Sequence, residues 1–460
     1  MQLKVNKYKD YFFYLFLFCL IQLWTIPHTI AARYVCEGLL LILIFSSRLE
    51  WNLILAKSKL LVVFFAYLLI QLFFFSTDLK TGFKGFKSEW MHFIIFSIIG
   101  AGAGLYIAKQ KTSNLLLYFG IAFLVVPLIH LFLSFFKFVE AGTIPWGYWG
   151  INDHHADLGY KALLASIFLS TFLFFETKKR FLNWLCVILL FFCITSPLIA
   201  QSRAGVIFVL LSLLFVFLIF IFILQLRQPF RLKDFLIIIT SLIFVGLIIK
   251  IGVAADPNRW GGMVSRALLG FHGDPNLVYC NGIENFRSAL LAEGITITPQ
   301  IEAGIKSVED GDGARIMAAR SGLVMVLENP MGINGSKKAY QTAITMFCQN
   351  PPAIFISHTH NGWIDTALAI GIPGAFLLLL VMLNYATQSF RMIKAGGRIN
   401  AFAIALFISA AVWVLRGILD STLRDHMLEM QAFTFALLLV LAIKFRKENE
   451  KINVLSKLSE

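Results

Sequence analysis

The fold class follows from one stretch: His360-Asn361-Gly362-Trp363-Ile364-Asp365-Thr366-Ala367-Leu368-Ala369-Ile370-Gly371-Ile372-Pro373-Gly374. It places an ionisable side chain at the water-facing mouth of an apolar run that is long enough to enter a bilayer. Because lipid offers a titratable group no partner, such a residue in a membrane protein usually serves a function. The stretch therefore predicts a membrane-spanning helix with a functional histidine, His360, at its water-facing end.

The composition of the whole chain agrees with a membrane protein. Of the 460 residues, 58% are hydrophobic, only 14% are charged, and 46 are Phe. A soluble fold could not bury that much apolar surface, whereas a bilayer solvates it directly. The net charge of +14 does not indicate nucleic acid, because the basic residues lie in short gaps between apolar runs and form no single patch.

Long apolar runs predict about twelve membrane spans. Only helices satisfy all their backbone groups inside lipid without closing a barrel, and the runs lack strand alternation. We therefore expect an all-α polytopic membrane protein. The expected spans are 11–27, 33–47, 59–76, 90–108, 114–136, 158–176, 181–200, 204–226, 234–254, 361–387, 399–418 and 427–445.

The charges between these spans predict how the chain is oriented. Alternate gaps carry basic residues such as Lys57, Lys109 and Lys178, and these gaps share one side with both termini, so that side should face the cytoplasm. The gap 77–89 carries three lysines on the other side and does not follow this pattern. The first apolar run could be a cleaved secretory signal, but no small-residue cleavage site follows it, so we expect a retained helix.

A polar segment of roughly a hundred residues, 255–358, is long enough for a small helical domain of its own. Within it, Met317 to Leu327 has a helical composition and ends before Asn329-Pro330, a typical stop signal. The expected organisation is 1–254 with nine spans, 255–358 as an external loop domain, 359–446 with three spans, and 447–460 as a cytoplasmic tail. Cys280 and Cys348 both lie in the loop, where either a disulfide or two free thiols fits the sequence.

Three residues far apart in the sequence share the external side. Arg203 lies in a tight turn between two apolar runs, where snorkelling to the interface is the alternative to a functional role. Arg315 and Arg320 are five residues apart, about 140° around a helix, so one could face a site and the other solvent.

The third residue is His360, accompanied by His358. Histidine is the side chain best suited to exchange a proton near neutral pH, although a histidine that merely caps a helix is the usual case. Here Gly371 and Gly374 allow close helix packing, and Pro373 favours a kink that could open space beneath the mouth.

Three rival clusters point to chemistry less strongly. The Asp-x-Asp pattern at 310–312 could bind metal, but in an acidic, glycine-rich loop we expect a solvated turn. The polar run 152–157, which includes His155, lacks further Cys or His at metal-binding spacing, so contact with an acceptor or a carrier lipid is the better interpretation. Charged residues at the last hairpin are interpreted as plain hairpin charges rather than lipopolysaccharide contacts: Arg416, Asp420, Arg424, Asp425 and His426. No metal site is expected.

These residues resemble a known family. His360-Asn361, followed by nine residues and Gly371-x-x-Gly374, is similar to the signature of bacterial O-antigen ligases. Their superfamily includes O-antigen polymerases and oligosaccharyltransferases that act on proteins. Ser202-Arg203 and the stretch from Arg315 to Pro330-x-Gly332-x-x-Gly335 resemble two further landmarks of the family. Twelve spans in a GT-C-like fold, with one large periplasmic loop, also fit.

The resemblance implies a metal-independent and cofactor-free glycosyl transfer with inversion, on the periplasmic side of the bacterial inner membrane. The donor would be a glycan on undecaprenyl diphosphate, and the acceptor a sugar hydroxyl of lipid A–core. Arg203 and Arg315 would bind the diphosphate and His360 would be the base, with Arg320, His358, Asn361 and His155 as possible additional contacts.

Two other functions stay open at this point. A polymerase that joins repeat units, or a protein-glycosylating relative, would use the same donor chemistry. A transporter or flippase usually places polar residues near the bilayer midplane within repeated halves. Here the ionisable residues lie at the external helix ends and no halves match, so the sequence favours an enzyme.

Overall fold

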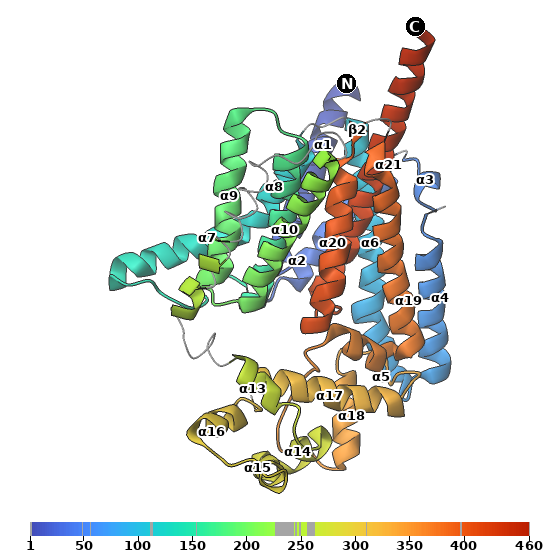
Figure 1. The fold of residues 1–460 in the computed structure, drawn as a ribbon. Helices are drawn as coiled ribbons and strands as arrows, with labels where there is room; N and C mark the ends of the chain where they lie inside the picture. Colours follow the sequence, from blue (N-terminus) through green and yellow to red (C-terminus); the bar gives the residue numbers. More distant parts are fainter. Residues whose placement is uncertain are drawn as a thin grey trace.

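The computed structural model describes residues 2–47, 49–55, 57–110, 114–152, 154–225, 243, 246–247, 250–254, 263–309, 311–395 and 398–459. Almost all regular structure in these ranges is helical. The strands there form one short antiparallel pair, β1 (Lys394–Ala395) with β2 (Arg398–Ile399). The all-α polytopic class expected from the sequence is confirmed (Figure 1).

The first half of the chain carries the helices α1 (Gln2–Leu23), α2 (Ile30–Phe45), α3 (Asn52–Leu55), α4 (Lys59–Ile70), α5 (Leu79–Gly85), α6 (Met91–Gln110), α7 (Leu115–Ala141), α8 (His155–Phe175), α9 (Arg180–Ile199) and α10 (Arg203–Gln225). Two π-helical turns, η1 (Gln71–Phe75) and η2 (Phe86–Trp90), continue α4 and join α5 to α6. The second half carries α13 (Met263–Leu269), α14 (Pro275–Asn281), α15 (Ile283–Ala292), α16 (Pro299–Lys306), α17 (Asp312–Glu328), α18 (Ala339–Cys348), α19 (Gly362–Met392), α20 (Ala401–Leu419) and α21 (Asp425–Ser459).

Eight helices of the described residues are long and apolar enough to cross a membrane. They are Leu79–Gln110, Leu115–Ala141, His155–Phe175, Arg180–Ile199, Arg203–Ile223, Gly362–Met392, Ala401–Leu419 and Asp425–Ile452, and Lys59–Phe75 is a shorter apolar helix. The expected spans 11–27 and 33–47 fall in α1 and α2, and 234–254 lies mostly outside the described residues. The expected number of about twelve is therefore not established.

The gap expected between spans at 77–89 is helical from Leu79 onward. Asp78 caps α5 by accepting hydrogen bonds from the backbone N–H groups of Lys80 and Thr81, and α5 continues through η2 into α6. The lysines of this segment are exposed, so they lowered the local hydropathy without ending the helix. The positive charges thus belong to an extension of one long helix.

Figure 1 shows α6, α19, α20 and α21 side by side in an upright bundle, with α8 and α10 next to them. Both chain ends lie at one end of the bundle, and α13–α18 lie at the other. Small residues permit the closest helix contacts. A Cβ on Gly100 of α6 would collide with the backbone of Phe433 in α21, and Gly159 of α8 faces Gly205 of α10.

The helices α13–α18, from the segment expected as a loop domain, bury apolar side chains such as Tyr279, Phe286 and Met317, and these belong to the same buried cluster as the bundle. Cys280 and Cys348 form a disulfide that joins α14 to α18. The choice that the sequence left open is thereby settled in favour of the disulfide. In addition, α17 ends at Glu328, one residue before Asn329-Pro330, as the stop signal predicted.

Helix α19 is interrupted at Gly371, where φ is +83°. The Pro330–Gly335 segment fits into this break: Ile372 N–H donates to Pro330 O (2.8 Å) and Gly335 N–H donates to Ala369 O (2.7 Å). Gly332 also has a positive φ, and a Cβ there would collide with the Gly371 backbone. The two glycine motifs that stood apart in the sequence thus pack against each other, and the kink predicted beside Pro373 lies at Gly371.

Candidate functional site

His360 stands in the short loop before α19, with φ at +56° in the left-handed region that few side chains adopt. The loop is held by one carboxylate of α19. Asp365 Oδ1 accepts hydrogen bonds from Thr359 N–H (2.9 Å) and from Thr359 Oγ1 (2.8 Å). The turn that carries His360 is therefore fixed from the first turn of its own helix.

The hairpin between α20 and α21 holds the same loop from the other side. Ser421 Oγ donates to Asp365 Oδ2 (2.6 Å), and Gly362 N–H donates to Asp420 O (3.1 Å). Asn361 caps α19 by accepting from the backbone N–H groups of residues 363 and 364, and its Nδ2 donates to Ile418 O (3.0 Å). Asn361, proposed as a possible contact, thus has a structural role in placing its neighbour.

His358 and His360 face each other with ring centroids 4.2 Å apart. Burial, together with the charges of His358 and Arg315, lowers the pKa of His360 to about 4, although Asp420 and Asp365 act in the opposite direction. The pKa of His358 is also lowered to about 4, again mainly by burial. His360 is therefore neutral near pH 7 and can accept a proton.

Arg315 and Arg320 point to different surroundings on α17, as their spacing predicts. The exposed Arg315 is close enough to depress the pKa of both histidines. Arg320 instead donates to the carbonyl oxygens of Gly270 (3.0 Å), His272 (3.2 Å) and Gly273 (3.0 Å). Of the two arginines, Arg315 is the one that shares a site with His360.

Arg203 opens α10 and forms a two-pronged ion pair with the first residue of α17. Its Nη2 lies 2.6 Å from Asp312 Oδ1 and its Nη1 lies 3.2 Å from Oδ2. A second guanidinium joins the same carboxylate, since Arg266 Nη2 lies 3.1 Å from Oδ2. Burial alone would raise the pKa of Asp312, but its hydrogen bonds and ion pairs with Arg203 and Arg266 outweigh burial and lower it. We call these three residues the arginine clasp.

The clasp and the histidine pair are connected through α17. Asp312 and Arg315 are three residues apart in its first turns, so they lie on neighbouring positions of one helix face. The ends of α10, α17 and α19, together with α13, thereby bring three guanidinium groups, one carboxylate and a neutral histidine to one region. Guanidinium forks match phosphate oxygens in shape and charge.

Sequence reasoning missed both Asp312 and Arg266. The solvated turn expected at 310–312 is wrong for Asp312, which is buried and doubly paired, while Asp310 lies outside the described residues. The sequence signal that could have identified Asp312 was its position about one helical turn before Arg315. In the described ranges, no group of three His, Cys, Asp or Glu side chains could hold a metal ion.

The residues of the other two predicted clusters, the run 152–157 and the last hairpin, contact different parts of the molecule. In the run 152–157, Asn152 accepts a hydrogen bond from Thr25 (3.0 Å) and Asp157 pairs with His426 (2.8 Å); His155 begins α8, and residue 153 lies outside the described residues. The interpretation of the last hairpin as plain surface charges is wrong for Arg416. That residue is fully buried and stacks 3.5 Å from the ring centroid of Tyr160.

Comparison with known proteins adds one finding. Residues 185–379 match the model of a protein family described as O-antigen ligase. The matched range runs from α9 to the middle of α19, so it includes the arginine clasp, Arg315, the histidine pair and both glycine motifs. A search of curated proteins found no match to the chain.

Proposed function

We propose that this multi-pass membrane protein, whose residues 185–379 belong to the O-antigen ligase family, transfers a glycan from undecaprenyl diphosphate to a sugar hydroxyl of lipid A–core. The observation that carries the proposal is the neutral His360, held in a fixed turn beside Arg315. A base and a cation at one site suit a reaction in which a hydroxyl loses a proton while a phosphate gains charge.

In the proposed reaction, the imidazole of His360 accepts the proton of the acceptor hydroxyl. The hydroxyl oxygen then forms a bond to the anomeric carbon of the donor, and the bond from that carbon to the phosphate oxygen breaks. Because the attack comes from the face opposite the leaving group, the anomeric configuration inverts. Undecaprenyl diphosphate leaves with the electron pair of the broken bond.

Arg203 and Arg315 would bind the diphosphate and stabilise the charge that develops as it leaves. Asp312 keeps the Arg203 guanidinium in place through two contacts, so its cationic fork needs little reorganisation when the donor binds. Fixed cations of this kind can do the work that Mg²⁺ does in many phosphate-releasing enzymes. Arg320 is not part of this step, because its donors already hold three carbonyl oxygens.

We place this reaction on the periplasmic face of the inner membrane, with both termini in the cytoplasm. The support is the alternation of basic gaps together with the position of both chain ends opposite α13–α18 in Figure 1. The disulfide between Cys280 and Cys348 also suits an oxidising compartment.

The test uses a bacterial host whose only copy of the gene carries His360→Ala, with His154→Ala as the matched control. His154 is an exposed histidine before α8 whose side chain forms no helix-capping hydrogen bond. Lipopolysaccharide and the lipid-carrier fraction are examined together. The proposal predicts bare core with long polymer left on the carrier for His360→Ala, and a normal ladder for the control.

Other outcomes assign the chain elsewhere within the superfamily or outside it. Core that carries a single repeat unit would indicate a polymerase, and a normal ladder with protein glycans lost would indicate a protein-glycosylating enzyme. If glycan attachment continues at the normal rate with normal protein levels, His360 is not the base and the proposed mechanism is wrong.

A further inference from the structure

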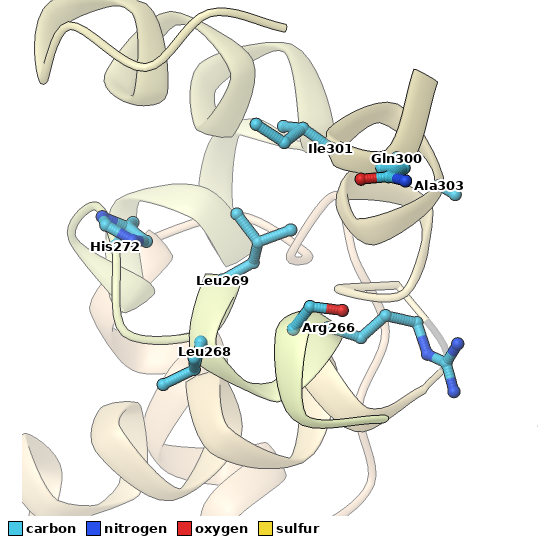
Figure 2. A pocket seen from close by; sticks show the side chains of 8 residues that line it. Arg266, Leu268, Leu269, His272, Gln300, Ile301 and Ala303 are labelled. Carbon is cyan, nitrogen blue, oxygen red and sulfur yellow. The ribbon is translucent and has the colours of Figure 1, made fainter. Parts of the chain in front are cut away.

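A cavity of about 490 Å³ lies between α13 and α16, in the part of the molecule outside the spans. Figure 2 shows Leu269 of α13 and Ile301 of α16 on its two sides, with Arg266 extending from α13 at another edge. A volume of this size lies within the range of pockets that bind small molecules or a few linked sugar rings. No step of the proposed reaction uses this cavity.

The cavity adjoins the arginine clasp through one shared residue. Arg266 lines the cavity, and its Nη2 lies 3.1 Å from Asp312 Oδ2. The same carboxylate holds Arg203, the proposed diphosphate ligand. A donor whose phosphates lie at the clasp would therefore have the atoms next to those phosphates close to the cavity.

The lining suits a saccharide. Gln300 offers a side-chain amide and His272 an imidazole whose Nδ1 pairs with Glu293 (2.6 Å), while Leu268, Leu269, Ile301 and Ala303 offer aliphatic surface. A sugar ring presents both kinds of group, hydroxyls at its rim and C–H groups on its faces. The polyprenyl chain fits less well, because in Figure 1 α13 lies between α16 and the bundle, so the cavity is on the side away from the spans that contact lipid.

From these contacts we propose that the cavity is a binding subsite for the first sugars of the donor glycan, and that Arg266 joins this subsite to the diphosphate site. The inference rests on the proposed function, since it takes its ligand from the donor. It adds a residue, Arg266, and a surface that would select among glycans, while the clasp and His360 act on the part that all donors share.

The test compares two lipids on the purified full-length protein by native mass spectrometry: undecaprenyl diphosphate alone, and the same lipid carrying the glycan of the host. Ala303→Trp fills the cavity from an exposed position of α16, and Gln300→Ala removes one polar group without adding bulk. Ser288→Trp is the matched control, because Ser288 is exposed on α15 and lies outside the lining. The melting temperature of each variant is measured alongside.

We expect wild type to bind the glycan-bearing lipid more tightly than the bare lipid. Ala303→Trp should lower the affinity for the glycan-bearing lipid about tenfold, and Gln300→Ala should lower it by a smaller factor. Neither variant should change the affinity for the bare lipid. Ser288→Trp should change neither. The subsite is overturned if wild type binds both lipids equally, if both cavity variants bind like wild type, or if they weaken both lipids alike.

A failure of the proposed function looks different. In that case wild type transfers no glycan to lipid A–core, yet its preference for the glycan-bearing lipid and the loss of that preference in Ala303→Trp would still appear. The subsite would then stand as a glycan-binding site of a protein with another activity.

Discussion

The histidine loop and the arginine clasp differ in what holds them. The loop around His360 is fixed mainly by backbone groups and by the hydroxyls of Thr359 and Ser421, all donating to Asp365 or to carbonyl oxygens. The clasp is fixed by opposite charges, with Asp312 between Arg203 and Arg266. The contacts of the histidine loop come from uncharged donors, whereas the arginines are held by charge, the same force with which they would bind a phosphate. The turn that carries His360 and the arginines are thus both fixed, but by different forces.

The largest effect should come from the base itself. His360→Ala removes the proposed proton acceptor and leaves the hydrogen bonds of Asp365 to Thr359 and Ser421 in place, so kcat should fall about 10²–10⁴-fold with little change in the KM for donor. Steady-state kinetics on the purified protein measure both constants. A large rise in KM with kcat unchanged would mean that His360 binds the donor and does not act as the base.

A smaller effect is expected when the clasp loses its carboxylate. Asp312→Asn leaves two partly buried guanidinium groups without their anion, which should lower the free energy of unfolding by about 2 kcal/mol, less than for a fully buried pair. Thermal melting with and without undecaprenyl diphosphate measures this loss. Added lipid should recover part of it, because the phosphates supply negative charge, and Asp312→Glu should lose less than Asp312→Asn.

The pH dependence of stability tests whether the ion pairs of the arginine clasp cause this loss. The pKa of Asp312 is lowered in the folded protein, so its contribution to stability is complete above the ordinary carboxyl range near 4 and is lost as the pH falls through the lower folded value. The difference in melting temperature between wild type and Asp312→Asn should therefore shrink at acidic pH. A constant difference would show that the ion pairs do not account for it.

Changing Asp365, the carboxylate that holds the histidine loop, should lower kcat and leave the affinity for the donor unchanged. Asp365→Asn keeps the size of the side chain but weakens its bonds to Thr359 and Ser421, so His360 should be less well placed and kcat should fall about tenfold. Asp365→Glu should recover part of the rate if position is the cause. Equal losses in kcat and in donor affinity would remove the contrast with the clasp.

The smallest expected change is a shift along the pH axis. His358 is one of the groups that lower the pKa of His360, so His358→Gln should raise that pKa from about 4 toward the ordinary value. Because the base must be deprotonated, the acidic limb of kcat/KM should then move to higher pH, with the rate near pH 8 unchanged. A limb that does not move would mean that another group controls it.

The sequence was sufficient for the class of fold, because apolar runs long enough to span a membrane are visible as local patterns. Short motifs also singled out His360, Arg203 and Arg315, whose roles stay predictions. It could not show that Asp312 lies between two arginines, since Asp312 is 109 residues from Arg203 and 46 residues from Arg266. It also did not show that α6 continues back through η2 and α5 to Leu79, because the exposed lysines of this segment lower the local hydropathy.

The interlock of Gly332 and Gly371 has a consequence for recognising distant relatives. Both positions have positive φ, and a Cβ on either would collide with the backbone at the other, so neither can change without separating the two segments. The histidine is under no such steric constraint and could be exchanged during divergence while the architecture survives. Under the proposed mechanism, a homologue that keeps both glycines but lacks His360 is therefore expected to be a pseudoenzyme, with an intact scaffold and no transferase activity.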